Sequence, residues 1–383
     1  MMSNQDVVVM LDFKGNLTTA KSDARNRHVI YGQSLKNLSK GSPLRLVVIS
    51  RGNLSKSDNS DSIDFHEIKC AKIDFLRFIV FGIGVIRRNG YLTRVVVSSD
   101  PWESFFIGKF FQIIIKPKPK LQLQVHADIS DNKWRSANLA NLLRSILQRY
   151  TFNHCDQIRV VSRNLQVYIN SISQNKNIVT VPIPIIIPQK EIKKSPVKTK
   201  LLRIGFFGRI QKDRGTDVLF SLVSKLNCER KDFELFIAGK GSEESELRRN
   251  LQKTIGERRS HFLGHLSQTE VWESLSDLDV YLSLAPAESY GLGMREAIIS
   301  GVPVIAVNSN GAIDAKNIFG EQKVKLIDPS ISGASLSKVI DEVLANGSDP
   351  GFSQEMREQN LTHVDTLVKS WFDLARSSEG KEI

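Results

Sequence analysis

Residues 280–307, with the sequence VYLSLAPAESYGLGMREAIISGVPVIAV, decide the fold of this chain. The apolar runs Val280–Leu284 and Pro303–Val307 predict two short buried strands, and Gly293–Ser300 between them predicts a helix. A strand, a helix and a second strand in this order form the unit from which parallel sheets are built. The stretch therefore indicates an α/β fold.

The same alternation extends from this stretch towards the N-terminus. In the second half of the chain the pattern predicts strands over Leu202–Phe207, Phe233–Ala238 and His261–Leu263, and helices over Asp217–Asn227, Glu243–Ile255 and Gln268–Leu275. In the first half it predicts a helix over Asp23–Lys40 and strands over Val7–Leu11, Leu44–Ser50, Thr93–Ser99, Leu121–His126 and Ile158–Ser162. Two such series predict two tandem Rossmann-like domains with doubly wound parallel sheets.

A proline-rich stretch, Val179–Lys200, separates the two series. It has no helical period and more prolines than an interior strand tolerates. We therefore predict an N-terminal domain over residues 1–181, a linker over 182–200, a C-terminal domain over 201–350 and a C-terminal helix over 351–383. Apolar residues recur at helical spacing in Gln354–Ser377, so this helix packs either back on the N-terminal domain or as a simple C-terminal cap.

Composition narrows the class of protein and of partner. The 383 residues include 53 Lys and Arg against 41 Asp and Glu, a net charge of +12, which favours an anionic partner such as nucleic acid, an acidic membrane surface or a phosphorylated small molecule. Three cysteines without metal-ligand spacing argue against structural zinc and for a reducing compartment. Because no secretory signal and no apolar run of spanning length is recognised, we expect a cytoplasmic protein.

The first candidate site residues follow the predicted strand Leu202–Phe207, since ligands of open α/β sheets bind beyond the carboxyl ends of the strands. They are Gly208, Arg209 and Arg214. Two guanidinium groups at the start of a helix suit a diphosphate, which they can bind through bidentate hydrogen bonds. The alternative is that both arginines are solvated residues of a basic protein.

Two more loops carry candidate ligand contacts. Gly239 and Gly241 permit a ligand to approach the backbone closely, but neither a third glycine nor a Walker lysine completes a dinucleotide or P-loop motif. Glu288 and Glu296 lie in the loop and helix after Val280–Leu284, beside a helix start that favours anions. Two such carboxylates can bind different hydroxyls of one sugar nucleotide, while the alternative for Glu296 is a surface position on the helix.

These loops together resemble a known family. The stretch from Glu288 to Glu296, followed by Gly301–Ile305 and Asn310-Gly311, resembles the C-terminal domain of the retaining GT-B glycosyltransferases of family 4, the glycosyl transferases group 1. Gly208-Arg209, Arg214-Gly215, Ala238–Gly241 and Phe262–Gly264 follow in the family's order, so the resemblance covers about residues 201–315. It implies a GT-B fold, in which two parallel sheets of Rossmann-like domains face an interdomain cleft.

The resemblance implies a role for each matching residue. Arg209 and Arg214 would hold the donor diphosphate, and Arg214 stands where the family has a lysine, which keeps the charge but changes its geometry. Glu288 would lie close to the donor sugar, and Glu296 would bind the nucleotide ribose. The other implied donor contacts are Gly208, Gly239, Gly241, Leu263, Ser289, Tyr290, Gly291 and Leu292.

The resemblance is thinner in the N-terminal half, which it implies to be the acceptor side. His126 follows a predicted strand and matches a family histidine that approaches the donor sugar across the cleft, although a core or surface histidine is the alternative. The family's glycine pair in the first loop is reduced to Gly15-Asn16, so only Gly15 is carried over as an acceptor-side residue.

The implied reaction moves a sugar from a UDP- or GDP-sugar to a glycan or a lipid-linked acceptor, with retention of the anomeric configuration, in cell-surface polysaccharide or glycolipid biosynthesis. Glu288, His126, Arg209 and Arg214 are the predicted catalytic residues. No Asp-x-Asp sequence stands at a predicted strand end, and two arginines can supply the charge of a divalent cation. We therefore expect neither a metal nor another cofactor.

Charge beside apolar residues predicts one further partner. Arg87, Arg88, Lys109, Lys116, Lys118 and Lys120 lie in or beside the apolar stretches Phe75–Ile86 and Phe105–Ile115. A basic rim beside exposed aromatics suits peripheral docking on an anionic membrane, at the inner face of the cell membrane, and the alternative is two core helices with solvated lysines.

Other functions fit the same sequence less well. A nucleotide-sugar epimerase shares the architecture, but the two-glutamate motif speaks against it. The altered first loop leaves room for a non-catalytic protein that binds sugar nucleotides or glycans. Nucleic-acid binding rests on charge alone and is not expected.

Overall fold

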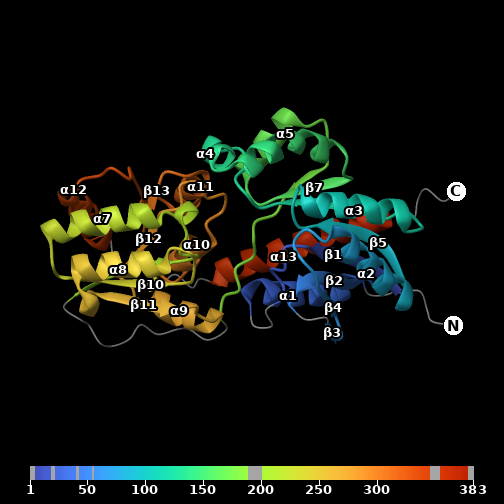
Figure 1. Ribbon diagram of the computed structural model, residues 1–383, viewed down its shortest axis with the longest axis horizontal. Coiled ribbons are helices and arrows are strands. Elements are labelled where there is room, and N and C mark those ends of the chain that lie inside the picture. Colours follow the sequence, from blue (N-terminus) through green and yellow to red (C-terminus); the bar gives the residue numbers. More distant parts are fainter. Residues whose placement is uncertain are drawn as a thin grey trace. The chain divides into compact units, whose positions relative to one another are not determined.

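A computed structural model of the chain describes residues 5–18, 22–39, 43–53, 56–188, 201–345 and 354–377. The described chain divides into two compact units (Figure 1). Unit 1 runs to Ser130 and includes Asn138–Ile186 and the chain from Glu358, and unit 2 consists of Asp131–Ala137 and Ile187–Arg357. Among the described helices, none combines the length and the apolar character needed to cross a bilayer.

Unit 1 is built on an 8-stranded sheet with the order β3-β4-β2-β1-β5-β6-β7-β8, in which only β3 runs antiparallel to its neighbour. The strands are β1 (Gln5–Asp12), β2 (Arg45–Gly52), β3 (Lys56–Asn59), β4 (Ile63–Lys69), β5 (Tyr91–Ser98), β6 (Lys120–Val125), β7 (Gln157–Val160) and β8 (Ile178–Thr180). The helices are α1 (Asp23–Leu38), α2 (Phe75–Arg88), α3 (Glu103–Ile114), α5 (Leu139–Asn153), α6 (Arg163–Ile172) and most of α13 (Gln354–Arg376).

Continuous apolar runs explain why the central strands of unit 1 form. Val7, Val8 and Val9 of β1 are fully buried, as are Val95 and Val96 of β5 beside it, because both faces of the sheet are covered. The predicted strands of this half are confirmed, and so is the helix of α1. Strands β3, β4 and β8 were not predicted from the sequence.

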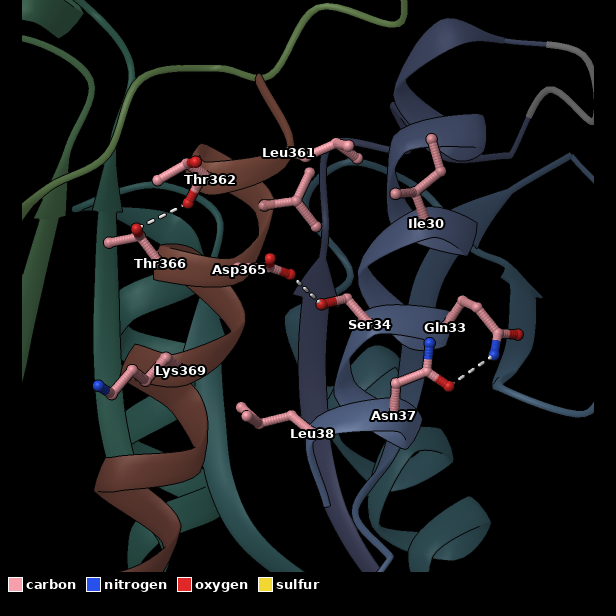
Figure 2. A pocket seen from close by; sticks show the side chains of 11 residues that line it. Ile30, Gln33, Ser34, Asn37, Leu38, Leu361, Thr362, Asp365, Thr366 and Lys369 are labelled. Carbon is pink, nitrogen blue, oxygen red and sulfur yellow. Dashed lines mark hydrogen bonds between the residues drawn. The ribbon is translucent and has the colours of Figure 1, made fainter. Parts of the chain in front are cut away.

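The C-terminal helix α13 packs into the core of unit 1. Trp371 is fully buried, its ring meets Tyr31 edge to face, and its indole N–H donates to Gln122 Oε1 at 2.7 Å. Gln122 in turn donates to Ser370 Oγ at 3.0 Å. A groove runs between α13 and α1, where Ser34 Oγ donates to Asp365 Oδ1 at 2.8 Å (Figure 2).

Unit 2 is built on a 6-stranded parallel sheet with the order β11-β10-β9-β12-β13-β14. Its strands are β9 (Leu202–Phe207), β10 (Phe233–Ala238), β11 (Ser260–Gly264), β12 (Val280–Ser283), β13 (Val304–Val307) and β14 (Val324–Ile327). Its helices are α4 (Asn132–Ser136), α7 (Thr216–Glu229), α8 (Glu244–Ile255), α9 (Gln268–Ser276), α10 (Leu292–Ile299), α11 (Asn310–Phe319) and α12 (Gly333–Ala345), with the short 3-10 turns η1 (Lys212–Arg214) and η2 (Glu257–Arg259).

Every strand and helix predicted for the second half between Leu202 and Val307 is confirmed within two residues at its ends. The prediction of two α/β domains with parallel sheets is also confirmed. The predicted boundaries at residues 181, 200 and 350 stay predictions, and residues 189–200 and 346–353, on which parts of them fall, lie outside the described ranges.

Candidate active site

The candidate site of unit 2 lies at the point where the strand order reverses. From β9 the chain crosses to β10 on one side, and from β12 it crosses to β13 on the other, while β9 and β12 are neighbours in the sheet. The loops after these two strands therefore diverge beyond the carboxyl edge, which is where open α/β sheets bind ligands. The loop after β9 carries Arg209 and Arg214, and the loop after β12 carries Glu288.

The two arginines differ in their surroundings. Arg209 is 58% exposed, and its Nη2 lies 3.6 Å from Asp213 Oδ2. Arg214 is 34% exposed, and its Nη1 donates to Glu288 Oε2 at 2.9 Å. The sequence analysis placed these residues at the same sheet edge, and the structure brings Arg214 and Glu288 into direct contact.

A glycine after η1 fixes the course of the arginine loop. Gly215 has φ +81°, and a Cβ on it would lie 2.1 Å from the carbonyl oxygen of Leu284. Only glycine fits a left-handed position that approaches another backbone so closely. The arginine loop is thereby held against the end of β12.

The loop after β12 leads directly into α10. Gly291 has φ +72° at the start of this helix, and Ser289 and Tyr290 before it are buried. The N–H of Gly311, at the start of α11, donates to the Glu288 carbonyl at 2.6 Å. The N-terminus of α10 thus follows Glu288 directly, and its dipole favours an anion there.

Glu296 lies on α10 and is only 7% exposed, so it is not a surface residue of the helix. Gln268 Nε2 donates to its Oε1 at 3.0 Å. Burial, followed by the negative charges of Glu296 and Glu288, raises the pKa of the neighbouring Tyr281, so this phenol stays protonated and donates to the Phe207 carbonyl at 2.9 Å.

The glycine loop after β10 packs on the arginine loop. A Cβ on Gly239 would lie 1.8 Å from the Gly208 carbonyl oxygen, and one on Gly241 would lie 2.0 Å from that of Ile210. These glycines are therefore required by contact between two backbones, whether or not they also contact a ligand. Leu263 at the end of β11 is 36% exposed, and Leu292 begins α10.

The sequence analysis missed two residues that support this site. Arg295 is buried, donates from Nε to the Tyr290 carbonyl at 2.9 Å and pairs with Asp314 at 2.6 Å. Gln268 holds Glu296, as described above. The available signal for Arg295 was its place close to Ala297, Ile298 and Ile299 in the predicted helix.

In unit 1, His126 follows β6 at the carboxyl edge of the sheet. Its Nε2 lies 3.1 Å from Gln124 Oε1 and 3.5 Å from Arg159 Nη1. Although the residue is exposed on one side, desolvation by the surrounding protein, and then the positive charge of Arg159, lower the pKa of His126 well below its usual range. The ring is therefore neutral at pH 7. Arg159, which the sequence analysis missed, also donates to the carbonyls of Val181 and Pro182.

The first loop of unit 1 is organised by a buried carboxylate. The N–H groups of Gly15, Asn16 and Leu17 donate to Asp12 at 3.1, 3.0 and 2.8 Å. Gly15 has φ +77°, and a Cβ on it would lie 2.3 Å from the Arg51 carbonyl oxygen. This packing by itself requires glycine at position 15.

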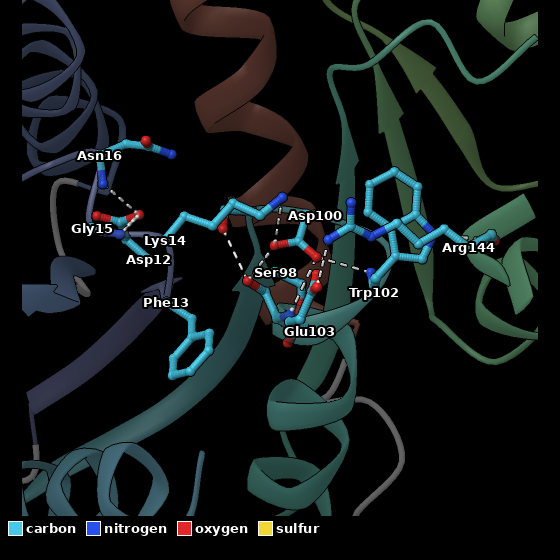
Figure 3. A network of polar contacts seen from close by, with 12 residues as sticks. Asp12, Phe13, Lys14, Gly15, Asn16, Ser98, Asp100, Trp102, Glu103 and Arg144 are labelled. Carbon is cyan, nitrogen blue, oxygen red and sulfur yellow. Dashed lines mark hydrogen bonds and ion pairs between the residues drawn. The ribbon is translucent and has the colours of Figure 1, made fainter. Parts of the chain in front are cut away.

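A second charged pair lies where the strand order of unit 1 reverses, between β1 and β5. Lys14 Nζ lies 3.6 Å from Asp100 Oδ2 and 5.6 Å from the centre of the Trp102 ring (Figure 3). Arg144 of α5 stacks over the same ring at 5.0 Å. Each unit therefore carries a cation–carboxylate pair at its own switch point.

Within the described residues no group of three or more His, Cys, Asp or Glu side chains is arranged to hold a metal ion. The three cysteines are free thiols.

Comparison with known proteins identifies relatives of this chain. The family described as glycosyl transferases group 1 matches residues 188–361. The GtfA subunit of the UDP-N-acetylglucosamine–peptide N-acetylglucosaminyltransferase of Streptococcus gordonii is 23% identical over 70% of this chain and 53% of its own length. The lipopolysaccharide core biosynthesis mannosyltransferase LpsB of Rhizobium meliloti is 30% identical over 37% of this chain and 40% of its own length. The chain thus spans about half the length of these relatives.

Solved structures resemble the whole chain. Sucrose-phosphate synthase from Thermosynechococcus elongatus superposes with a TM-score of 0.69 at 16% identity, covering 98% of both chains. Anabaena HepE in complex with UDP-glucose superposes with a TM-score of 0.66 at 12% identity, covering 98% of this chain and 99% of that one. The two α/β units have the GT-B fold that the sequence predicted.

Proposed function

Since residues 188–361 belong to the glycosyl transferases group 1 family, we propose that this chain is a retaining glycosyltransferase that uses a nucleotide-sugar donor. The observation that carries the proposal is the Arg214–Glu288 pair at the switch point of unit 2. A sugar diphosphate needs a cation beside its leaving group and a hydrogen-bond acceptor beside its sugar. This pair offers both within 2.9 Å.

The donor contacts follow from the arrangement of the loops. Arg209 and Arg214, with the N-terminus of α10, bind the diphosphate. Glu296, which Gln268 holds in place, accepts hydrogen bonds from the ribose hydroxyls. The proposed contacts of Gly208, Gly239, Gly241, Leu263 and residues 289–292 with the base, sugar or phosphate complete this site.

The donor is a UDP- or GDP-sugar. HepE was solved with UDP-glucose, and a relative from Corynebacterium glutamicum, 30% identical over 114 residues, is named a GDP-mannose-dependent mannosyltransferase. These names support a donor of this chemical class without selecting the sugar.

In the proposed reaction the anomeric carbon loses its bond to the β-phosphate oxygen and gains a bond to the acceptor hydroxyl oxygen on the same face. The acceptor proton passes to the departing phosphate oxygen. Arg209 and Arg214 stabilise the negative charge that develops on the diphosphate. Glu288 orients the sugar, and the neutral ring of His126 is proposed as a further sugar contact. The two arginines take the place of a metal ion, so no metal is required.

The acceptor is a glycan or a lipid-linked glycan in cell-surface polysaccharide or glycolipid biosynthesis. LpsB, a relative at 30% identity, is named for lipopolysaccharide core biosynthesis, which supports an acceptor of this class. The place of action is the cytoplasmic side, with the chain bound peripherally to the inner face of the cell membrane.

Proton NMR of the sugar released during slow donor hydrolysis tests this proposal. With EDTA present and an α-linked UDP- or GDP-sugar as donor, we expect the α-anomer of the free sugar to appear first and to mutarotate afterwards. Initial release of the β-anomer would refute retention. Release that requires added Mg²⁺ or Mn²⁺ would refute the proposed role of the arginines.

One observation favours a second candidate, a protein that binds sugar nucleotides without transferring the sugar. The first loop has Lys14-Gly15-Asn16, and packing against Arg51 explains Gly15 without any acceptor. Donor binding without hydrolysis, and without transfer to any glycan in a mixed acceptor pool, would select this alternative.

A further inference from the structure

Helix α5 exposes its apolar side to solvent. Leu139, Leu143 and Ile146 are 79%, 62% and 68% exposed, and Leu142, Leu147 and Tyr150 on the same stripe are exposed as well. Polar side chains on the opposite side, Asn141, Gln148 and Thr151, are buried. A surface helix of a soluble domain ordinarily shows the reverse arrangement.

Specific contacts hold α5 in this orientation. Arg144 pairs with Glu103 of α3 at 2.6 Å, and the Trp102 indole N–H donates to the Arg144 carbonyl at 3.2 Å. Gln148 Nε2 donates to the Tyr168 hydroxyl of α6 at 2.6 Å. Rotating the helix to bury its leucines would break these bonds, so the apolar stripe is presented by the fold itself.

The neighbouring helices extend the apolar surface. The ring of Phe105 in α3 meets that of Tyr150 in α5, and α3 packs closely against Gly82 of α2 through Phe111. Exposed apolar residues on α3 are Phe106, Phe110, Ile113 and Ile114, and those on or before α2 are Ile73, Phe75, Leu76 and Val80. We call the exposed apolar residues of α2, α3 and α5 the apolar surface of unit 1. Single exposed apolar residues are common, but a set on three adjacent helices marks an interaction site.

Positive charge is concentrated in the same part of unit 1. Its residues within the range 71–155 include eleven Lys and Arg against four Asp and Glu, a surplus of seven positive charges, compared with a net charge of +12 for the whole chain. Lys116 and Lys118 follow α3 and are exposed, as is Arg149 on α5. The partner of the apolar surface therefore combines an apolar region with negative charge.

We propose that the apolar surface of unit 1, with the stripe of α5 as its main anchor, docks on an anionic lipid bilayer. Its leucines and isoleucines enter the acyl boundary, while the surrounding lysines and arginines contact anionic headgroups. A second copy of the chain would bring the same positive charge against itself. A nucleic acid would leave the aliphatic stripe without a partner, because phosphates and base edges do not bind leucine.

The docked surface adjoins the candidate acceptor side. Arg144 of α5 stacks on Trp102, and Lys14 lies over the same ring and beside Asp100 at the switch point of unit 1 (Figure 3). Bilayer docking through α5 brings this pair near the headgroups. The placement of the acceptor rests on the proposed function, whereas the docking does not. If the proposed function holds, the acceptor is membrane-bound and its polar part reaches Lys14 and Asp100.

Co-sedimentation of the full chain with vesicles tests the docking. One set of vesicles contains phosphatidylglycerol and phosphatidylcholine and the other only phosphatidylcholine, and neither contains a glycan acceptor. We expect binding to the anionic vesicles that weakens when salt is raised from about 0.1 M to about 0.5 M. The double variant Leu143→Gln/Ile146→Gln should lower the partition coefficient at least about tenfold.

The matched control is Ile318→Gln/Leu361→Gln, which makes the same chemical change at two exposed positions, 61% and 60% exposed, on α11 and α13, helices that carry no residue of this surface. It should bind vesicles like the unchanged chain, and circular dichroism should show all proteins folded. No binding of the unchanged chain to anionic vesicles, or equal binding by the Leu143→Gln/Ile146→Gln variant, would overturn the proposal. The proposal would also be overturned if light scattering showed that the unchanged chain is a dimer which the Leu143→Gln/Ile146→Gln substitutions dissociate, while the unchanged chain binds no vesicles.

Donor hydrolysis, measured on the same preparations without vesicles, separates the two proposals. Hydrolysis by the Leu143→Gln/Ile146→Gln variant at the unchanged rate is expected, since α5 carries no proposed donor contact. Vesicle binding by a chain that neither hydrolyses a donor nor transfers its sugar to any glycan in the mixed acceptor pool would support the docking and refute the proposed transferase.

Discussion

At the residue scale, the Arg214–Glu288 pair is the centre of the proposed site. Both side chains are partly exposed, at 34% and 20%, so the pair contributes little to stability, on the order of 0–1 kcal/mol. A weak pair of this kind can exchange partners at small cost when a diphosphate arrives. In the proposed site, the pair places a cation and a carboxylate together before a donor binds.

Replacing this carboxylate tests its role in the reaction. Glu288→Gln keeps the size of the side chain but removes the charge that pairs with Arg214 and that we propose orients the sugar. We expect kcat to fall about 100-fold, while the Kd of the nucleoside diphosphate changes less than about threefold because Glu296 and Arg209 are retained. Steady-state kinetics and calorimetry measure the two quantities. Asp213→Asn, which removes an exposed neighbour of both arginines, is the control and should leave kcat within about threefold.

A histidine outside the donor site makes the stability of unit 1 depend on pH. Burial lowers the pKa of His28 to about 4, whereas the unfolded chain has the ordinary value of about 6.5. Between these values the unfolded state binds more protons, so stability falls as pH is lowered through 6.5 towards 4. Between pH 7 and pH 5, His28 should lower the free energy of unfolding by about 2 kcal/mol.

Urea unfolding at pH 7 and pH 5 measures this dependence. His28→Gln should lessen the difference between the two pH values by about 2 kcal/mol, because glutamine does not titrate. His66 and His126, whose pKa values are also lowered, keep their share of the difference. An unchanged difference in this variant would contradict the assignment to His28.

At the element scale, the glycines at the loop ends explain how the site keeps its shape. Gly215, Gly239 and Gly241 each lie where a Cβ would enter another backbone. The loops after β9, β10 and β12 pack against one another at these glycines. Two of these loops carry Arg209, Arg214 and Glu288.

A pair of alanine variants separates backbone crowding from backbone conformation. Gly215→Ala combines a left-handed φ of +81° with a Cβ that meets Leu284 O at 2.1 Å, so we expect a loss of at least about 3 kcal/mol. Gly264→Ala has a similar φ of +70° but no atom within 4 Å, so it should cost only about 1 kcal/mol. Chemical denaturation compares the two, and equal losses would contradict the proposed role of close packing.

Most elements of unit 2 could be predicted because its strands are continuous apolar runs that end in polar loops. In unit 1, β4 was missed because polar side chains interrupt it. Asp64 and His66 are buried there, and Asp64 is compensated by Arg45 at 2.6 Å and by the Tyr91 hydroxyl at 2.7 Å. These partners come from other strands, and a local pattern does not contain them.

The residues of the candidate site could be predicted from the sequence, but their contacts could not. Arg214 and Glu288 could each be found from the residues that follow a strand, but their contact depends on β9 and β12 being neighbours, which the strand order decides. The exposed stripe of α5 was missed for the opposite reason. Its leucines have an ordinary helical period, and only the packing of Arg144 and Gln148 determines which side faces solvent.

At the scale of the whole molecule, the end of the chain completes the first unit. Helix α13 buries Trp371, Val368 and Leu367 in the core formed by β1, β2 and α1. Trp371→Ala should lower the free energy of unfolding of unit 1 by about 3–5 kcal/mol, since it leaves a large cavity and deprives Gln122 Oε1 of its donor.

Leu361→Ala on the same helix is the matched control. Its side chain is 60% exposed, so the change should stay within about 0.5 kcal/mol. Urea unfolding followed by tryptophan-independent far-UV circular dichroism measures both variants. A Trp371→Ala protein as stable as the control would contradict the assignment of α13 to the core of unit 1.

We propose that unit 2 binds a nucleotide sugar at the switch point between β9 and β12, and calorimetric titration of UDP-, GDP- and ADP-sugars in the presence of EDTA measures this binding. We expect one UDP- or GDP-sugar to bind the unchanged chain without metal. For the same donor, Glu296→Gln should raise Kd about tenfold, because a buried charged hydrogen-bond acceptor for the ribose is lost. If no donor binds, or if the Glu296→Gln variant binds the donor as tightly as the unchanged chain, the switch point of unit 2 is not the donor site.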